Sequence, residues 1–142
     1  MKSPIRTRSF LISDYDAVVQ LWQTADGVEI AEGDSRANIA RYLKRNPNLS
    51  RVAEADGRVI GAVLCGHDGR RGIIYHLAVA VDYRGVGLGR KLLKECLAGL
   101  KAEGLTRVLL LVGKNNEAGQ AFWLSQGFEV IAEALPLGRD LI

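Results

Sequence analysis

The stretch from residue 81 to residue 93 has the residue types and spacing of an anion-binding loop. It reads Val-Asp-Tyr-Arg-Gly-Val-Gly-Leu-Gly-Arg-Lys-Leu-Leu, and it lies between an apolar, strand-like run and a helical pattern. Glycines at such a turn let a ligand approach the backbone, and the first amides of the helix lack internal partners and favour negative charge. Three basic side chains surround the loop: Arg84, Arg90 and Lys91. The stretch therefore predicts a bound phosphate or pyrophosphate.

The spacing of the glycines excludes the two common nucleotide-binding loops. A dinucleotide fingerprint that begins at Gly85 needs a third glycine where Arg90 stands. One that begins at Gly87 needs it where Leu92 stands. The P-loop ends in Gly-Lys-Ser/Thr, whereas Gly89 is followed by Arg90. The pattern that fits is Arg-x-x-Gly-x-Gly, formed by Arg84, Gly87 and Gly89.

The elements that position this loop follow from hydrophobic periodicity and turn residues. Asp56-Gly57 joins two extended runs as a hairpin turn, and Gly61 in the second run suggests a bulge. Helical spacing is expected over residues 14–24, 35–45, from 88 to about 100, and from 117 to before Gly127. Strands are expected over residues 4–12, 49–55, 58–66, 73–80, 107–112, 129–134 and 137–141.

The order of these elements predicts an α/β (α+β) fold with a mixed, mostly antiparallel sheet and helices on both faces. The run 107–112 is apolar throughout, which is typical of a strand covered on both sides. Since a helix connects it to the strand 73–80, these two strands are expected to be a parallel pair that diverges at its carboxyl ends. With 142 residues and no visible linker or repeat, one domain over residues 1–142 is expected.

Composition argues against several other classes of protein. No run approaches the roughly 18 apolar residues of a membrane span, and the N-terminus lacks the apolar stretch of a signal peptide, so a cytoplasmic protein without a membrane partner is expected. Cys65 and Cys96 lie in apolar patterns without a CxxC pair, which favours core residues over a disulfide or metal site. The net charge of +3 fits a polyphosphate ligand, and the scattered basic residues do not predict nucleic-acid binding.

Several local motifs together resemble the GNAT superfamily of acyl-CoA-dependent N-acyltransferases. The Arg-x-x-Gly-x-Gly loop has the form of that family's pyrophosphate loop, and Leu77-Ala78-Val79 precedes it. Asn116 opens the next helix, and Phe122-Trp123 stands four residues before Gly127-Phe128. The order of elements is similar to the GNAT fold along essentially the whole chain.

The resemblance implies acetyl-CoA as cosubstrate and no metal. The pyrophosphate would bind the amides of residues 85–90, and the pantetheine arm would lie along the strand edge, where the Val79 N–H would stabilise negative charge on the thioester oxygen. Asn116 would contact the cofactor, although a plain helix cap is equally compatible with its position. The residues implied to bind the cofactor are Leu77, Ala78, Val79, Arg84, Gly85, Val86, Gly87, Leu88, Gly89, Arg90, Asn116, Phe122 and Trp123.

The chain departs from the family's pattern at the general base. Family members frequently carry a Glu early in the strand before the loop, where this chain has Ile73-Ile74-Tyr75-His76. Imidazole titrates near neutral pH, which favours His76 as the base. If Tyr75 faces the cleft and lines the acetyl site, however, strict alternation points His76 to the opposite face.

The second departure concerns the general acid. Many relatives place a Tyr, thought to protonate the departing thiolate, where this chain has Trp123, whose indole N–H cannot do so. A thiol with a pKa of about 8.5 leaves as thiolate at pH 7 at a cost of roughly 2 kcal/mol, so the missing acid slows the reaction without forbidding it. Ser125 and Tyr75 are alternative donors, and packing on the helix is the alternative role of Trp123.

The segment between the first two helices is acidic and contains no basic residue. In the GNAT arrangement it covers the acceptor entrance, so Asp26, Glu29 and Glu32, together with Asp34, are expected to attract a cationic amine. A solvated acidic loop is the alternative. Another open possibility is that Arg70 and Arg71 bind an acidic group of the acceptor rather than being merely exposed.

These features predict an N-acetyltransferase that transfers the acetyl group of acetyl-CoA to a primary amine of a small molecule, peptide or protein. Direct attack in a ternary complex is expected because neither cysteine lies near the inferred cleft. The missing Glu and Trp123 leave a non-catalytic acyl-CoA-binding or sensing module as the alternative. The identity of the acceptor and the choice between monomer and homodimer stay open.

Overall fold

The computed structural model describes residues 3–25 and 27–142, which form two compact units that meet in sequence between Leu111 and Val112. The second unit contains α4 (Glu117–Ser125). The first contains β1 (Arg6–Ser9), α1 (Tyr15–Thr24), α2 (Arg36–Arg45), β2 (Arg51–Ala55), β3 (Arg58–His67), β4 (Gly72–Val79), α3 (Leu88–Ala102), β5 (Val108–Leu110) and the short 3-10 turns η1 (Ile12–Asp14), η2 (Glu32–Asp34) and η3 (Val81–Tyr83).

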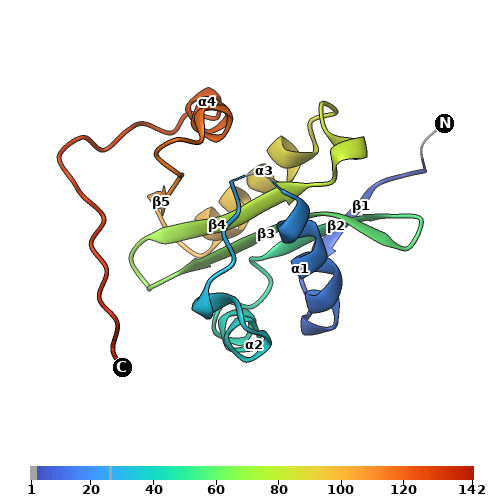
Figure 1. Ribbon diagram of the computed structural model, residues 1–142, viewed down its shortest axis with the longest axis horizontal. Helices are drawn as coiled ribbons and strands as arrows, with labels where there is room; N and C mark the ends of the chain where they lie inside the picture. The colour runs from blue at the N-terminus through green and yellow to red at the C-terminus, as the bar shows by residue number, and fades with distance from the viewer. Residues whose placement is uncertain (1–2, 26) are drawn as a thin grey trace. The chain divides into compact units, whose positions relative to one another are not determined.

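The first unit is built on one mixed sheet with strand order β1-β2-β3-β4-β5. Neighbouring strands are antiparallel from β1 to β4, and β4 and β5 are parallel. Helix α1 covers one face of the sheet and α3 the other (Figure 1). The predicted fold class is therefore confirmed, including the parallel pair that a helical crossover requires.

The hairpin between β2 and β3 also forms as predicted. Asp56 and Gly57 have φ values of 53° and 71°, the left-handed conformations of a two-residue hairpin turn. The predicted bulge lies beside Gly61, where the register shifts opposite Ala53 and Glu54. A Cβ atom at Gly61 would lie 3.0 Å from Leu92 Cδ1 of α3, so the missing side chain lets the helix pack closely on the strand.

The core of this unit is formed by apolar residues of the sheet and of the inner sides of α1 and α3, with Trp22 and Leu92 fully buried. Cys65 and Cys96 are buried and unoxidised, as predicted for core residues. The contact with Cys65, followed by burial, raises the pKa of the Cys96 thiol far above its ordinary range, so it is no nucleophile. No described helix has the length and apolarity needed to cross a membrane.

Two sequence predictions are wrong near the C-terminus. The residues 129–134 and 137–141 were expected to be strands, but no described residue after α4 belongs to a helix or strand. A strand exists only where a partner satisfies its amides and carbonyls. Residues 129–141 instead make a local turn, in which Ala134 N–H donates to Ile131 O. The expected strand 107–112 is reduced to β5, whose residues are half-buried rather than covered on both faces.

A partly buried ion pair between Arg8 and Asp14 fixes the start of α1 against β1. The Asp14 side chain is 10% exposed and accepts two hydrogen bonds of 2.8 Å from Arg8 and one of 2.9 Å from Leu11 N–H. The Arg8 guanidinium holds the pKa of the Asp14 carboxyl below its usual range. Such a carboxylate stabilises the fold above its unfolded pKa of about 3.9, and this contribution is lost as the pH falls through its folded value.

Replacing Asp14 with asparagine is expected to lower the free energy of unfolding by about 1.5 kcal/mol at pH 7, because the charged hydrogen bonds are lost while water reaches Arg8 in part. Urea unfolding should show this difference shrinking below about pH 4. Asp16→Asn, at a carboxylate that is 89% exposed, is the control and should be nearly neutral. A difference for Asp14→Asn that is independent of pH would contradict the ion-pair explanation.

Candidate functional site

The predicted anion loop connects η3 to α3. Gly85 and Gly87 have φ values of 79° and 82°, and Gly87 is the N-cap residue of α3. These left-handed conformations favour glycine and turn the chain sharply into the helix. The Arg84 Nε atom donates to the Val79 carbonyl at 3.1 Å, which holds the loop against the end of β4.

A run of unpaired amides follows this turn. Among the described residues, the N–H groups from Gly85 to Arg90 have no hydrogen-bond acceptor, and the first helical bond across the cap runs from Lys91 N–H to Gly87 O at 3.0 Å. The first turn of α3 contains no acidic residue, and Arg84 and Arg90 are exposed beside it. Free donors, the helix dipole and positive side chains are therefore combined here in the way that binding of a polyanion requires.

The edge of β4 that faces β5 is open beyond the third paired residue. The parallel pairing covers Gly72 to Ile74 and ends there. Ala80 N–H donates to Ile60 O on the opposite side at 2.8 Å, and successive strand amides alternate, so the Val79 N–H points to the open edge. The same alternation directs the amide of the buried Ala78 to β3, whereas Leu77 and Val79 are half-buried.

Tyr75 and His76 do not follow the strict alternation that the sequence suggested. The register shifts between Ala62 and Leu64 of β3, and His76 opposite this shift has a left-handed φ of 52°. The bulge places two β4 residues against one β3 residue, and the rings of Tyr75 and His76 come to 6.3 Å between centroids. The two candidate catalytic side chains are thus neighbours rather than on opposite faces.

Each of these side chains has a distinct environment. Tyr75 is 37% exposed, and partial burial raises the pKa of its hydroxyl, which stays protonated at neutral pH. The His76 ring packs edge-on against Trp22 of α1 with centroids 4.9 Å apart. Its Nε2 atom lies 2.8 Å from the Asp34 Oδ2 atom at the end of η2. A proton donor and a proton acceptor are therefore adjacent on one strand.

The acidic segment before α2 divides into exposed and buried members. Glu29 and Glu32 are exposed, as a region that attracts a cation requires, while the predicted Asp26 lies outside the described residues. Asp34 is 8% exposed and hydrogen-bonded to His76, so its carboxylate is not free to attract an amine. Sequence reasoning missed this contact because the two residues are 42 positions apart and no local pattern links them.

In the second unit, Asn116 caps α4: its side-chain oxygen accepts from Gly119 N–H at 2.9 Å, which is the capping role predicted as an alternative. Trp123 packs edge-on between Phe122 and Phe128, with ring centroids 5.1 and 5.3 Å away. The Ser125 hydroxyl donates to Phe122 O at 2.6 Å. Within this unit the three predicted residues Asn116, Phe122 and Trp123 therefore also have structural roles.

Comparisons with known proteins agree on one family. The model of the acetyltransferase (GNAT) family matches residues 15–128. An acetyltransferase from Pectobacterium atrosepticum is 33% identical over 135 residues, which is 95% of this chain and 94% of that protein. Among solved structures, Ard1 from Thermoplasma volcanium superimposes with a TM-score of 0.79 at 23% identity, covering 90% of this chain and 84% of that one. The PaiA N-acetyltransferase of Thermoplasma acidophilum in complex with coenzyme A gives 0.76 at 21% identity, covering 89% and 91%.

Proposed function

The chain belongs to the GNAT acetyltransferase family, and from this premise we propose that it is an acetyl-CoA-dependent N-acetyltransferase that acetylates a primary amine. The observation that carries the proposal is the run of unpaired amides from Gly85 to Arg90 at the start of α3. A pyrophosphate is the ligand that a run of free donors at a helix N-terminus suits. The coenzyme A complex of the Thermoplasma acidophilum relative supports the same ligand.

The residues around this loop fit coenzyme A. The glycines at 85 and 87 keep the approach to the amides clear, since a Cβ built at either position meets nothing within 4 Å. Arg84 and Arg90 are exposed at the loop and would balance the charge of the phosphates. When bound, acetyl-CoA supplies an activated acetyl group. Leu77, Val86, Gly89 and the amide of Leu88 complete the proposed cofactor site in this unit. The family resemblance also implies Ala78, whose amide is directed to β3.

The open edge of β4 supplies the donor for the developing charge. The Val79 N–H points to that edge without a strand partner and would donate to the thioester oxygen as negative charge builds there. The Arg84 Nε atom holds the Val79 carbonyl in the next peptide group, which fixes the end of β4 beside this donor before the substrate arrives. A preorganised donor of this kind stabilises charge better than water, which must reorient.

His76 and Tyr75 are proposed to move the protons. A substrate ammonium gives one proton to His76, directly or through a water molecule, and the neutral amine then forms the new C–N bond as the C–S bond breaks. The nitrogen passes its second proton, directly or through water, to Tyr75, which gives its own hydroxyl proton to the departing thiolate. His76 releases the first proton to solvent, so that one proton ends on the thiol and the other in solvent. Because both cysteines are buried, no covalent enzyme intermediate is proposed.

Further parts of the proposal rest on sequence and family. The family match from residue 15 to residue 128 supports a single acetyltransferase domain, and the resemblance supports cofactor contacts of Asn116, Phe122 and Trp123. Glu29 and Glu32 are exposed acids that would attract a cationic acceptor, with Asp26 as a third. A cytoplasmic location and a monomeric or homodimeric state stay predictions. So do the expectations that the protein uses no metal and binds neither nucleic acid nor a membrane.

Binding and turnover of acetyl-CoA test the proposal together. Acetyl-CoA at a hundred times its dissociation constant should stabilise the protein by about 2.7 kcal/mol, measured as a rise in melting temperature. A panel of polyamines, amino acids and peptides with free N-termini should contain acceptors that accelerate thiol release from acetyl-CoA, and the matching tertiary amines should not. The absence of stabilisation would reject the cofactor. Stabilisation without turnover on the whole panel would favour the non-catalytic binding module.

A further inference from the structure

Asp34 and His76 form a carboxylate–imidazole pair in the interior of the first unit. The Asp34 Oδ2 and His76 Nε2 atoms are 2.8 Å apart, and the two side chains are 10% and 18% exposed. One residue ends the turn before α2 and the other lies in the middle of β4. A charged hydrogen bond shielded from water is strong and directional, so it can fix the orientation of the ring.

The backbone of His76 is held in an unfavourable conformation to make this contact. A φ of 52° is rare for a residue with a side chain, and here it coincides with the bulge against β3. Such a conformation persists only where the surroundings require it. The edge contact with Trp22 and the bond to Asp34 hold the imidazole in place.

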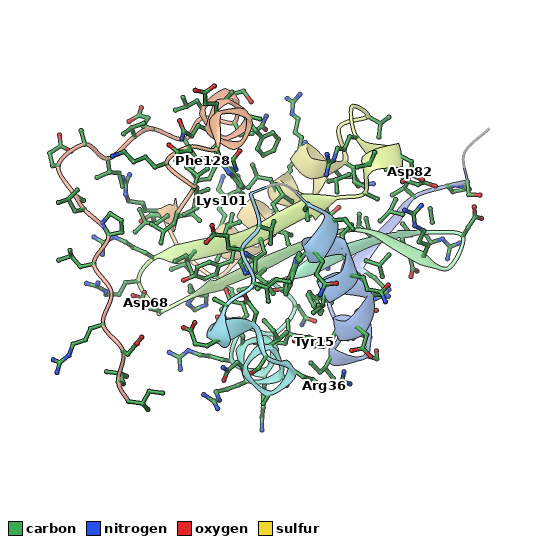
Figure 2. The ribbon with its side chains drawn as sticks, in the orientation of Figure 1. Tyr15, Arg36, Asp68, Asp82, Lys101 and Phe128 are labelled. Atoms are coloured by element: carbon green, nitrogen blue, oxygen red, sulfur yellow. The ribbon has the colours of Figure 1, made fainter. Side chains whose placement is uncertain are left out.

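Asp34 is itself held at its carboxylate and at its backbone. Its Oδ2 atom accepts from Ala31 N–H at 3.1 Å, and its backbone carbonyl accepts from the Tyr15 hydroxyl at 2.6 Å. The Tyr15 ring in turn lies 5.7 Å from the Arg36 guanidinium, and Figure 2 shows these two side chains next to each other. The Ala31 amide therefore holds the carboxylate oxygen that contacts His76, and Tyr15 of α1 holds the backbone of the same residue.

This geometry selects one tautomer of His76. An ionised carboxylate only accepts hydrogen bonds, so the Nε2 atom carries the proton and donates it to Asp34. The lone pair of the neutral ring then lies on Nδ1. This atom has no hydrogen-bond partner among the described residues, and it is not fully buried. The basic nitrogen is thus the one that solvent or a substrate reaches.

We propose that Asp34 is a positioning residue of the acetyl-transfer reaction: it holds His76 as the Nε2–H tautomer, with Nδ1 as the proton acceptor, and stabilises the imidazolium that forms. This inference rests on the proposed function of His76 as general base. Among contacts of the described residues, the titratable groups beside the ring are Asp34 from η2 and Tyr75 from its own strand, and α1 contributes the uncharged Trp22. The role resembles that of a carboxylate that orients a catalytic imidazole.

Asp34→Asn tests the inference by two readouts. Ala31 N–H and His76 Nε2 both contact the Oδ2 atom, so a single atom of the amide replaces this acceptor. The amide oxygen is an uncharged and therefore weaker acceptor for Nε2–H, and the NH₂ group in the same place would donate to Nε2 and select the wrong tautomer. We expect kcat/KM for the amine to fall by about a hundredfold at its plateau, and the acid limb of its pH profile to move to lower pH because the imidazolium has lost its carboxylate. A purely structural role would lower the plateau without moving the limb. Asp34→Glu should restore part of the plateau value of kcat/KM and part of the position of the acid limb.

The second readout needs no substrate. The sequence has only two histidines, so ¹⁵N spectra of the imidazoles, assigned with His67→Gln, report the tautomer of His76 directly. We expect the Nε2–H form in the wild type and a loss of that preference in Asp34→Asn. His67 is the matched control: its Nε2 lies 3.0 Å from Glu103 on the surface, and Glu103→Gln should change neither the pH profile nor the spectrum of His76.

The outcomes separate the two proposals. If no amine is acetylated by the wild type, the proposed function fails, while the spectra still decide whether Asp34 sets the tautomer. If the wild type acetylates amines but shows the Nδ1–H tautomer, or if Asp34→Asn leaves the acid limb and the spectrum unchanged, the role of Asp34 is overturned and the function stands. If Asp34→Asn does not fold, the wild-type spectrum decides: the Nε2–H form supports the role of Asp34, and the Nδ1–H form overturns it.

Discussion

Replacing His76 with glutamine is expected to lower kcat/KM for the amine acceptor about a thousandfold at pH 7. The proposed role of His76 is to remove the proton from the substrate ammonium, and general base catalysis contributes about 10²- to 10⁴-fold. Glutamine can occupy a similar volume beside Trp22 and hydrogen-bond to Asp34, but it cannot accept this proton. Thiol release measured at several amine concentrations gives kcat/KM for the variant and for the wild type.

The pH dependence distinguishes loss of a base from general damage. A primary amine loses its proton in solution near pH 10, so the deficit of His76→Gln should shrink as the pH approaches that value. The dissociation constant of acetyl-CoA should stay within about threefold, because the amide loop does not involve His76. His67→Gln, at the last residue of β3, is the control and should retain normal activity. Activity of His76→Gln within a few-fold of wild type would show that another group takes the proton.

Replacing Gly87 with valine is expected to weaken acetyl-CoA binding by at least about a hundredfold, or about 2.7 kcal/mol. At a φ of 82° the β-branched side chain forces the cap of α3 to change its conformation, and this moves the amides that are proposed to bind the pyrophosphate. Inside the protein the new Cβ would meet nothing within 4 Å, so the effect should fall on the ligand site rather than on packing. Titration calorimetry with acetyl-CoA measures it.

Gly69 offers a matched control for this substitution. It lies in the turn between β3 and β4 with a φ of 92°, and a Cβ built there also meets nothing within 4 Å. Gly69→Val should therefore strain the backbone to a similar degree and lower the melting temperature, while leaving acetyl-CoA affinity unchanged. Equal losses of affinity in the two variants would mean that the loop before α3 is not the pyrophosphate site.

Local patterns were sufficient for most of the fold. Asp56-Gly57 specifies a tight turn by its backbone preferences alone, and Ser35 and Asn116 cap α2 and α4 through bonds to amides three residues on. The same holds for the loop at Gly85 and Gly87, whose unusual φ values are a property of glycine. These features depend on interactions between near neighbours, which are visible in the sequence.

Features that depend on distant partners could not be predicted in this way. The expected strands after α4 failed because an apolar run becomes a strand only when another strand satisfies its backbone. Strict alternation failed at Tyr75 and His76 because the bulge arises from the pairing of β4 with β3, and no residue in β4 itself signals it.

The amino-acid sequence by itself determined the family, the mixed sheet and the anion loop that opens α3, because glycine spacing, hydrophobic periodicity and caps act within a few residues of chain. It also supplied His76 as a candidate base, although strict alternation pointed the ring away from Tyr75. Only the tertiary structure decided that His76 lies beside Tyr75 and contacts Asp34, since the contact with Asp34 joins residues 42 positions apart. The physical reason is that the direction of a side chain on a bulged strand, and the partner that fixes its proton, are set by neighbours in space rather than in sequence.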